Sequence, residues 1–212
     1  MFNINKYTEI KDKIEKSNGK SQIIAISKNH PKESVTEAIS KGVYIFGENR
    51  VIEAKNKFKE IKLQFPQVEL HLTGPLQSNK VKEAISLFDV FHTLDREKIV
   101  REFSKHADKI LNKKFFIQVN TGEEKTKSGV YPSDLKNFLE FCINEMSLNI
   151  SGLMCIPPID ESPNDHFNFI NDLAKKNKLE ETSFGMSNDY EIALSFKPTY
   201  IRLGTILFGK RN

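Results

Sequence analysis

The sequence is poor in the features that mark several protein classes. It has two cysteines, Cys142 and Cys155, which are too few for a disulfide framework and are not spaced like metal ligands. Its longest apolar stretches, such as 43–46 and 115–117, are far shorter than the roughly 20 residues that span a bilayer. The chain therefore lacks the pattern of a disulfide-rich secreted domain, a zinc module or a membrane-spanning protein.

The amino-terminal segment also lacks a secretory signal. Residues 1–16, MFNINKYTEIKDKIEK, contain no apolar h-region. Together with the sparse cysteines, this predicts a protein of the reducing cytoplasm. We expect no membrane partner.

Charge of one sign is not concentrated anywhere in the chain. The net charge is +4, from 32 Lys+Arg against 28 Asp+Glu. Lysines alternate with glutamates in EIKDKIEK and NKFKEIK, as on solvated helix faces. Nucleic-acid-binding proteins instead gather basic residues on one face, so we expect no nucleic-acid partner.

What the chain does contain is a regular alternation of short β-branched or aromatic segments and longer amphipathic segments. The predicted strands cover 23–27, 44–48, 69–74, 90–94, 115–120, 150–156, 182–186 and 199–203. The predicted helices cover 31–41, 49–64, 78–87, 95–110, 133–146, 162–176 and 187–196, and an extra helix over 4–16 precedes the first strand. Since no strand-turn-strand hairpin occurs, the sheet is predicted to be parallel.

Eight parallel strands are the number that closes a (β/α)8 TIM barrel. The competing fold is a doubly wound sheet, which usually has fewer strands and, for nucleotides, a Gly-rich first turn. Here the first strand is followed by Ser-Lys-Asn-His-Pro, without glycine. No repeat or linker divides the chain, so we expect a single barrel domain over 1–212.

The carboxyl ends of the strands are where such barrels carry their active sites. The polar residues expected there are Lys28, Asn49, His71, Thr73, His92, Asn120, Ser187, Arg202 and Thr205. No cluster of carboxylates is among them, which argues against a Mg²⁺ site. Two histidines without a third ligand argue against zinc, so no metal site is predicted.

Lys28 is the most informative of these residues. It follows an apolar strand, so its stem is expected to rise through apolar surroundings to the barrel mouth. Burial disfavours the ammonium form, lowers the pKa and makes the amine a nucleophile toward an aldehyde. The alternative is an ordinary surface lysine at a strand end.

The ends of the seventh and eighth strands add an independent signal. Phosphate sites in these barrels use the loops there and a helix amino terminus. Ser187 is expected to cap a helix beginning at Asn188, and Gly204 and Thr205 offer N–H groups and a hydroxyl. The alternative is an ordinary cap and a tight turn, and the acidic Asp189 and Glu191 would have to point outward. A nucleophilic lysine across from a phosphate site suggests pyridoxal 5′-phosphate (PLP).

A set of motifs then points to a known family. The segments IIAISK, FGEN, HLTGPLQSNK, HTLDR, IQVN with KSG, GLMCIPP, FGMSNDYEIAL and IRLGTILFGKR occur in this order. They closely resemble the YggS/PROSC family of pyridoxal-phosphate-binding proteins, also called PLP homeostasis proteins. The resemblance runs from about residue 20 to residue 211, and GPLQSNK and the pair GMS and RLGT are its most specific parts.

The resemblance implies a fold like the N-terminal domain of alanine racemase (fold-type III PLP proteins), with PLP as a Schiff base on Lys28. It implies that Arg202 faces the pyridine nitrogen. It further implies roles in holding the cofactor for Ser187, Gly204 and Thr205 at the phosphate and for Asn49 and His71 along the lining, with Lys127 as a second lysine nearby. Thr73 and Arg50 depart from the family pattern, which usually has an apolar and an aromatic residue there.

Three functions follow from this interpretation. The first is a PLP carrier that buffers the cofactor or delivers it to apo-enzymes, and this is the function the resemblance implies. An arginine at the ring nitrogen disfavours its protonation, so carbanion chemistry would be weak and the protein is expected not to be an enzyme. The second is an amino-acid racemase, which would need a second base such as a tyrosine; only Tyr44 and Tyr190 are expected near the mouth.

The third function is a cofactor-free Schiff-base aldolase, which would need an acid–base partner beside Lys28 that the sequence does not reveal. The length also bears on the choice, since 212 residues give each βα unit about 26 residues. That leaves no room for the second domain of a racemase. A closed barrel without an added domain is expected to be a monomer, because it offers no open sheet edge.

Overall fold

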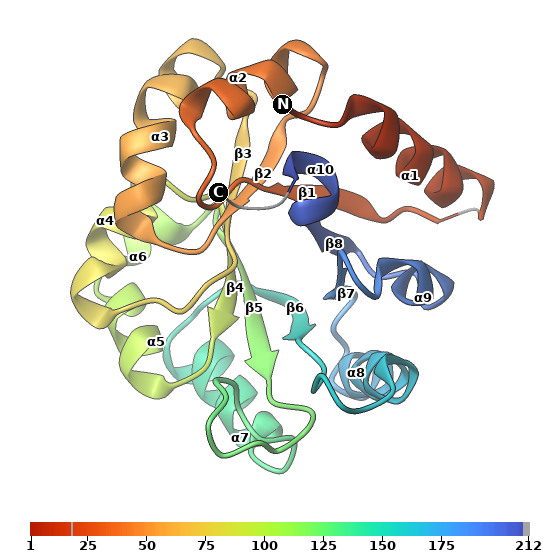
Figure 1. Ribbon diagram of the computed structural model, residues 1–212. Coiled ribbons are helices and arrows are strands. Elements are labelled where there is room, and N and C mark those ends of the chain that lie inside the picture. The colour runs from red at the N-terminus through yellow and green to blue at the C-terminus, as the bar shows by residue number, and fades with distance from the viewer. Residues whose placement is uncertain (18, 210–212) are drawn as a thin grey trace.

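The computed structural model describes residues 1–17 and 19–209, and its centre is a closed barrel of eight parallel strands in the order β1 to β8. The strands are β1 Gln22–Ile26, β2 Ile45–Glu48, β3 Glu69–Leu72, β4 Val90–Leu94, β5 Lys114–Val119, β6 Ile150–Cys155, β7 Glu181–Met186 and β8 Tyr200–Leu203. The helices lie around the outside of the sheet (Figure 1). The predicted (β/α)8 barrel is confirmed, and the predicted strands differ from the observed ones only by a residue or two at their ends.

The helices follow the predicted alternation, although several are shorter than expected. They are α1 Ile4–Lys16, α2 Lys32–Ser40, α3 Val51–Gln64, α4 Val81–Ile85, α5 Glu97–Ser104, α6 Ala107–Ile110, α7 Leu135–Glu140, α8 Pro163–Lys176, α9 Tyr190–Ser195 and α10 Thr205–Phe208, with a 3₁₀ turn η1 at Ser78–Lys80 and a π-helical turn η2 at Phe141–Glu145. The extra amino-terminal helix is confirmed. Within the described ranges, no helix is both long enough and apolar enough to cross a membrane.

Three predicted helices are each divided in the structure, and one of them, 78–87, forms η1 followed by α4. The segment 95–110 forms α5 and α6, because the backbone leaves the helical region at His106, where φ is −125° and ψ is 35°. The segment 133–146 begins as α7 and widens into η2. None of these breaks occurs at a glycine or a proline, so the residue types that usually interrupt helices do not predict them.

Helix α3 buries the face that its apolar residues suggest, except that Ile52 lies outside it and Lys57 lies within it. Ile52 follows helical spacing with the buried residues Val51, Ala54, Phe58 and Ile61 in the sequence, but it is 58% exposed. The buried stripe instead includes Lys57 beside Phe58 and Ile61. Val51 already occupies the inward position of the first turn, and Ile52 follows it by 100° around the helix. The buried face of α3 therefore includes one charged residue among its apolar ones.

The core has two layers, one between the sheet and the helices and one inside the barrel. Successive strand side chains point to opposite faces of the sheet, so Ile23 and Ala25 pack in the outer layer whereas Ile24 and Ile26 pack in the inner one. The inner layer also contains Phe116. The barrel is thus a packed core, and any ligand site must lie at one of its ends.

The amino-terminal segment braces the chain that follows β8. The Asn3 N–H donates a hydrogen bond to the Leu207 carbonyl over 2.8 Å. The Phe2 ring packs edge-on against Phe208, with 5.1 Å between ring centroids. Because α10 directly follows the last strand, this contact supports the loop that ends the barrel.

Strands β6 and β7 approach so closely that a side chain does not fit between them at Gly152. A Cβ atom added there would lie 2.0 Å from the Glu181 carbonyl oxygen and 2.8 Å from the Phe116 ring. The first contact is with backbone, which cannot rotate away as a flexible side chain can. Gly152 is therefore required by the close approach of the two strands.

We predict that Gly152→Ala destabilises the protein by about 1–3 kcal/mol, because β6 and β7 must separate to admit the methyl group. The shift in the midpoint of urea unfolding measures the effect. Ser151→Ala, at the neighbouring position of the same strand, serves as the control and should shift the midpoint little. An unchanged midpoint for Gly152→Ala would show that the strands separate without cost.

Candidate ligand-binding site

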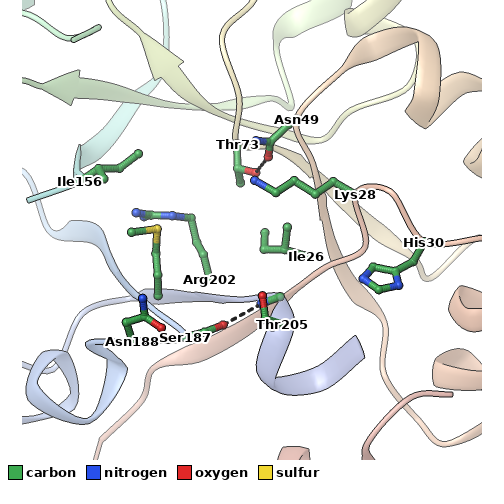
Figure 2. A pocket seen from close by; sticks show the side chains of 12 residues that line it. Ile26, Lys28, His30, Asn49, Thr73, Ile156, Ser187, Asn188, Arg202 and Thr205 are labelled. Atoms are coloured by element: carbon green, nitrogen blue, oxygen red, sulfur yellow. Dashed lines mark hydrogen bonds between the residues drawn. The ribbon is translucent and has the colours of Figure 1, made fainter. Parts of the chain in front are cut away.

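A pocket of about 300 Å³ opens at the carboxyl ends of the strands, at the barrel mouth. Its lining comes from the ends of most of the strands and from the loops after them. The lining residues are Ile26, Lys28, His30, Asn49, Thr73, Ile156, Met186, Ser187, Asn188, Arg202, Gly204 and Thr205 (Figure 2). The volume lies at the lower end of the range for small-molecule sites, about 300–1,000 Å³.

The described lining of the pocket is basic and contains no acidic residue. It includes the basic side chains of Lys28, His30 and Arg202, together with amides, hydroxyls and apolar groups. No carboxylate is among these described residues. The pocket is therefore suited to an anionic ligand.

Lys28 lies in the turn between β1 and α2, as the sequence predicted. Its side chain is partly buried, and its amine points across the pocket toward Thr73 and Asn49 (Figure 2). Thr73 Oγ1 donates a hydrogen bond to Asn49 Oδ1 over 3.0 Å, so these two residues form one side of the pocket. The residue after Lys28, Asn29, has φ 62°, in the left-handed region. Asparagine is among the few residues that adopt this conformation readily.

Arg202 lies on β8 and is the buried cation of the pocket, with only 5% of its surface exposed. Its Nη1 donates to Ser183 Oγ over 2.8 Å, and its Nη2 donates to the Cys155 carbonyl oxygen over 3.0 Å. Burial lowers the pKa of Arg202, but a guanidinium stays charged in proteins. Both contacts are with neutral groups, so the charge of Arg202 is not cancelled by a carboxylate in contact with it.

The loops after β7 and β8 meet at Ser187, although Ser187 does not cap a helix as the sequence predicted. Helix α9 begins later, at Tyr190, with Asp189 as its N-cap residue. Ser187 Oγ instead accepts the Gly204 N–H over 3.3 Å, which joins the two loops. Thr205 then opens α10, where the first N–H groups of a helix lack partners within it.

The two acidic residues near this edge do not line the pocket. The Asp189 carboxylate accepts the Met186 N–H over 2.5 Å. The Glu191 carboxylate forms an ion pair with Lys13 of α1 over 2.7 Å. Both carboxylates are thus engaged by other groups, and Asp189 lies close enough to Arg202 to favour the charged form of its guanidinium.

His71 lies away from the pocket lining, although the sequence predicted it as a lining residue. Its Nδ1 is joined by a hydrogen bond to His92 Nε2 over 2.8 Å, and its Nε2 to Glu69 Oε1 over 2.6 Å. Glu69 opens β3, so these bonds direct the imidazole toward the opposite end of the barrel. His92, also expected at the mouth, is fully buried in the same interior, and burial lowers its pKa well below the usual value.

Other residues singled out from the sequence also lie outside the lining. Lys127 and Arg50 are exposed and do not line the pocket. Tyr190 is buried in α9, and its hydroxyl donates to Glu191. Tyr44 is 38% exposed, before β2 begins. The pocket of the described chain thus contains no tyrosine.

Several functional residues were missed in the sequence. His30 lines the pocket and stacks on Phe208, with 5.2 Å between ring centroids. Ile156 and Asn188 complete the lining. His30 could have been found from its place in the turn after β1, two residues beyond Lys28, and Ile156 from its place at the carboxyl end of the predicted strand 150–156.

A buried ion cluster next to Lys28 was also missed. Lys57 of α3 donates to Glu48 Oε1 over 2.7 Å and to Glu53 Oε1 over 3.2 Å. Glu48 is fully buried, and burial raises the pKa of its carboxyl group. The available signal was a lysine at an inward position of an amphipathic helix, since buried lysines are rare unless they are paired.

Comparison with known proteins places the chain in a family. The model of the family described as "Alanine racemase, N-terminal domain" matches residues 5–212. The chain is 35% identical over 202 residues to the pyridoxal phosphate homeostasis protein of Aquifex aeolicus, covering 91% of this chain and 88% of that one.

Solved structures agree with this assignment. PipY of Synechococcus elongatus, at 34% identity, matches 90% of this chain and 93% of its own. The TM-score is 0.83 for PipY without PLP and 0.79 for PipY with PLP bound. Alanine racemase of Clostridium difficile, at 14% identity and a TM-score of 0.70, matches 90% of this chain and 52% of its own, and shows the shared fold. The chain therefore belongs to the family of pyridoxal phosphate homeostasis proteins, whose barrel is that of the alanine racemase N-terminal domain.

Proposed function

We propose that this protein binds PLP as a Schiff base on Lys28 and serves PLP homeostasis by buffering the cofactor or delivering it to apo-enzymes. The observation that carries the proposal is the lining of the pocket, which combines a lysine amine and a buried arginine with no carboxylate. An amine is the group that reacts with an aldehyde, and the cations suit a phosphate. The PLP-bound structure of the relative PipY supports the same ligand.

Different residues of the pocket would hold the aldehyde end and the phosphate of PLP. Lys28 supplies the amine from the β1 side, whereas the loops after β7 and β8 supply Ser187, Gly204 and Thr205. These loops are already tied together by the bond from the Gly204 N–H to Ser187 Oγ. A phosphate there would meet backbone N–H groups and hydroxyls that the fold holds in place.

Arg202 favours a binder over a catalyst. PLP, when bound to an enzyme, serves as an electron sink, and this works best when its ring nitrogen is protonated. The buried guanidinium of Arg202 keeps a permanent positive charge at the pocket, which disfavours a second positive charge nearby. The lining of the described chain also offers no tyrosine as a second base for a racemase.

Further properties follow from the same fold. All eight strands belong to one closed sheet, which supports a single domain over 1–212 and, because no strand edge is open, a monomer.

The two cysteines are free and buried, and burial raises the pKa of each thiol to about 12. Unreactive free thiols are consistent with a reducing cytoplasm.

Lys28→Ala is expected to abolish covalent attachment of PLP, because it removes the amine. The wild-type protein mixed with PLP and reduced with borohydride should carry the added mass on the peptide containing residue 28, as read by mass spectrometry. Lys59→Ala, an exposed lysine of α3, is the matched control and should label as the wild type does. Equal labelling of the Lys28→Ala protein would overturn the assignment.

Thr205→Val is expected to weaken binding of PLP on the order of tenfold, as for the loss of one hydrogen bond to a charged group. Binding of pyridoxal, which has no phosphate, should not change. Equilibrium dialysis with both ligands measures the difference, and Thr8→Val on the exposed face of α1 is the control. Equal weakening of both ligands would place the phosphate elsewhere.

The carrier and the racemase differ in turnover. The PLP-loaded protein is incubated with single L-amino acids, and the D-form and the keto acid are assayed against free PLP at the same concentration. We expect no more product than free PLP gives. Turnover well above that level would replace the carrier by the enzyme.

A further inference from the structure

A buried ion cluster lies next to Lys28, and none of its residues has a role in the proposed binding of PLP. We call Lys57, Glu48 and Glu53 the Lys57 cluster. The Lys57 Nζ donates three hydrogen bonds: to Glu48 Oε1 over 2.7 Å, to Glu53 Oε1 over 3.2 Å and to the Ser27 carbonyl oxygen over 2.7 Å. An ammonium has three hydrogens to donate, so its hydrogen-bonding capacity is filled.

The cluster holds the chain on both sides of Lys28. On the amino-terminal side, the Ser27 hydroxyl donates to Glu48 Oε1 over 2.6 Å and the Ser27 carbonyl accepts from Lys57. On the carboxyl-terminal side, the Asn29 N–H donates to Glu53 Oε1 over 2.5 Å. The backbone that carries Lys28 is thus fixed at the residue before it and the residue after it.

Stability does not account for such a cluster. Lys57 is 6% exposed and Glu48 is fully buried, and one oxygen of Glu48, Oε2, has no partner among the described residues. Removing charges from water is costly, and replacing a buried ion pair by apolar residues is often neutral or stabilising. Apolar side chains at these inward positions would pack without that cost, but they could not hold Ser27 and Asn29.

We propose that the Lys57 cluster is a positioning device that aims the Lys28 amine at the aldehyde carbon of the ligand. The inference rests on the proposed function. None of its three residues lines the pocket, so they act through the Lys28 backbone and do not touch the ligand.

The step that depends on this aim is the formation of the Schiff base. The Lys28 nitrogen, in its neutral form, attacks the aldehyde carbon and forms a C–N bond. The aldehyde oxygen leaves as water with the two protons of the amine, and a C=N bond remains. The attack needs a close approach in one direction, and a misplacement of about 1 Å can cost on the order of a hundredfold in rate.

The test separates the rate of this step from binding. The variant is Lys57→Met, which keeps an unbranched side chain but removes the donors. Lys55→Met is the matched control, because Lys55 is an exposed lysine of the same helix that pairs with Glu83. The rate of Schiff-base formation is followed by absorbance after mixing with PLP. Binding is measured as the affinity for pyridoxine 5′-phosphate, which has an alcohol in place of the aldehyde.

We expect Lys57→Met to slow Schiff-base formation by about ten- to a hundredfold. Its affinity for pyridoxine 5′-phosphate should equal that of the wild type, since the phosphate-binding loops are untouched. Lys55→Met should match the wild type in both measurements. A purely structural role for Lys57 would lower both quantities together.

A second variant guards against a failure of Lys57→Met to fold. Glu53→Ala removes the acceptor of the Asn29 N–H, and the Glu53 side chain is 26% exposed, so the change leaves no buried cavity. It should slow the reaction by about tenfold with unchanged analogue affinity.

Two results would overturn the inference. One is a wild-type rate in folded Lys57→Met or in Glu53→Ala, and the other is a parallel loss of rate and analogue affinity. Failure of the proposed function looks different, because the wild-type protein would then form no Schiff base with PLP at all.

Discussion

The pairing of β1 with β8 joins the two ends of the chain and closes the barrel, and the site depends on this contact. Ile24 lies beside Arg202 and Ala25 beside Leu203 in the register of the two strands. The residues that follow each strand, Lys28 on one side and Gly204 on the other, are therefore neighbours at the mouth. A parallel sheet that did not close would leave these groups at opposite edges, and no pocket would combine them.

Closure also creates an interior that must be filled, and polar groups fill part of it. A column of hydrogen bonds runs through this interior. It begins at Arg202 and continues through Ser183, His92 and His71 to Glu69 at the other end of the barrel. Each buried polar group in this column thereby has a partner, as buried polar groups require. The column contacts Arg202 through the neutral hydroxyl of Ser183, which fixes the guanidinium without cancelling its charge.

The sequence predicts the barrel well because short β-branched and aromatic segments, which are buried on both faces as strands, alternate with amphipathic segments that form helices. It also places Lys28, Asn49 and Arg202 correctly in the pocket, since the carboxyl ends of parallel strands converge. It fails where a side chain has a choice of partner. His71 lies within the predicted strand 69–74 and was expected near the mouth, yet both of its ring nitrogens are hydrogen-bonded inside the barrel.

The same limit explains the other differences. Ser187 precedes an acidic helix start and looks like a cap, but Asp189, two residues later, supplies the N-cap position. The local sequence contains both options. Only the contact with Gly204, at the end of the neighbouring strand β8, decides between them. Lys57 was predictable as a buried cation from its place on α3. Its acceptors were not, because Glu48 and Ser27 come from two different strand ends.

The two buried cations near the mouth are compensated in opposite ways, and this difference has a chemical meaning. Lys57 contacts two carboxylates, so its charge is balanced within the protein. Among the described residues, Arg202 contacts only a hydroxyl and a carbonyl, and Asp189 acts on its charge from a distance without pairing with it, so its guanidinium reaches the pocket without a carboxylate in contact. A buried charge without a counter-ion is costly, and an anionic ligand reduces that cost when it binds. The carboxylates of the cluster thus lie around Lys57, beside the backbone that carries Lys28, whereas Arg202 lines the pocket without a carboxylate of the described chain in contact with it.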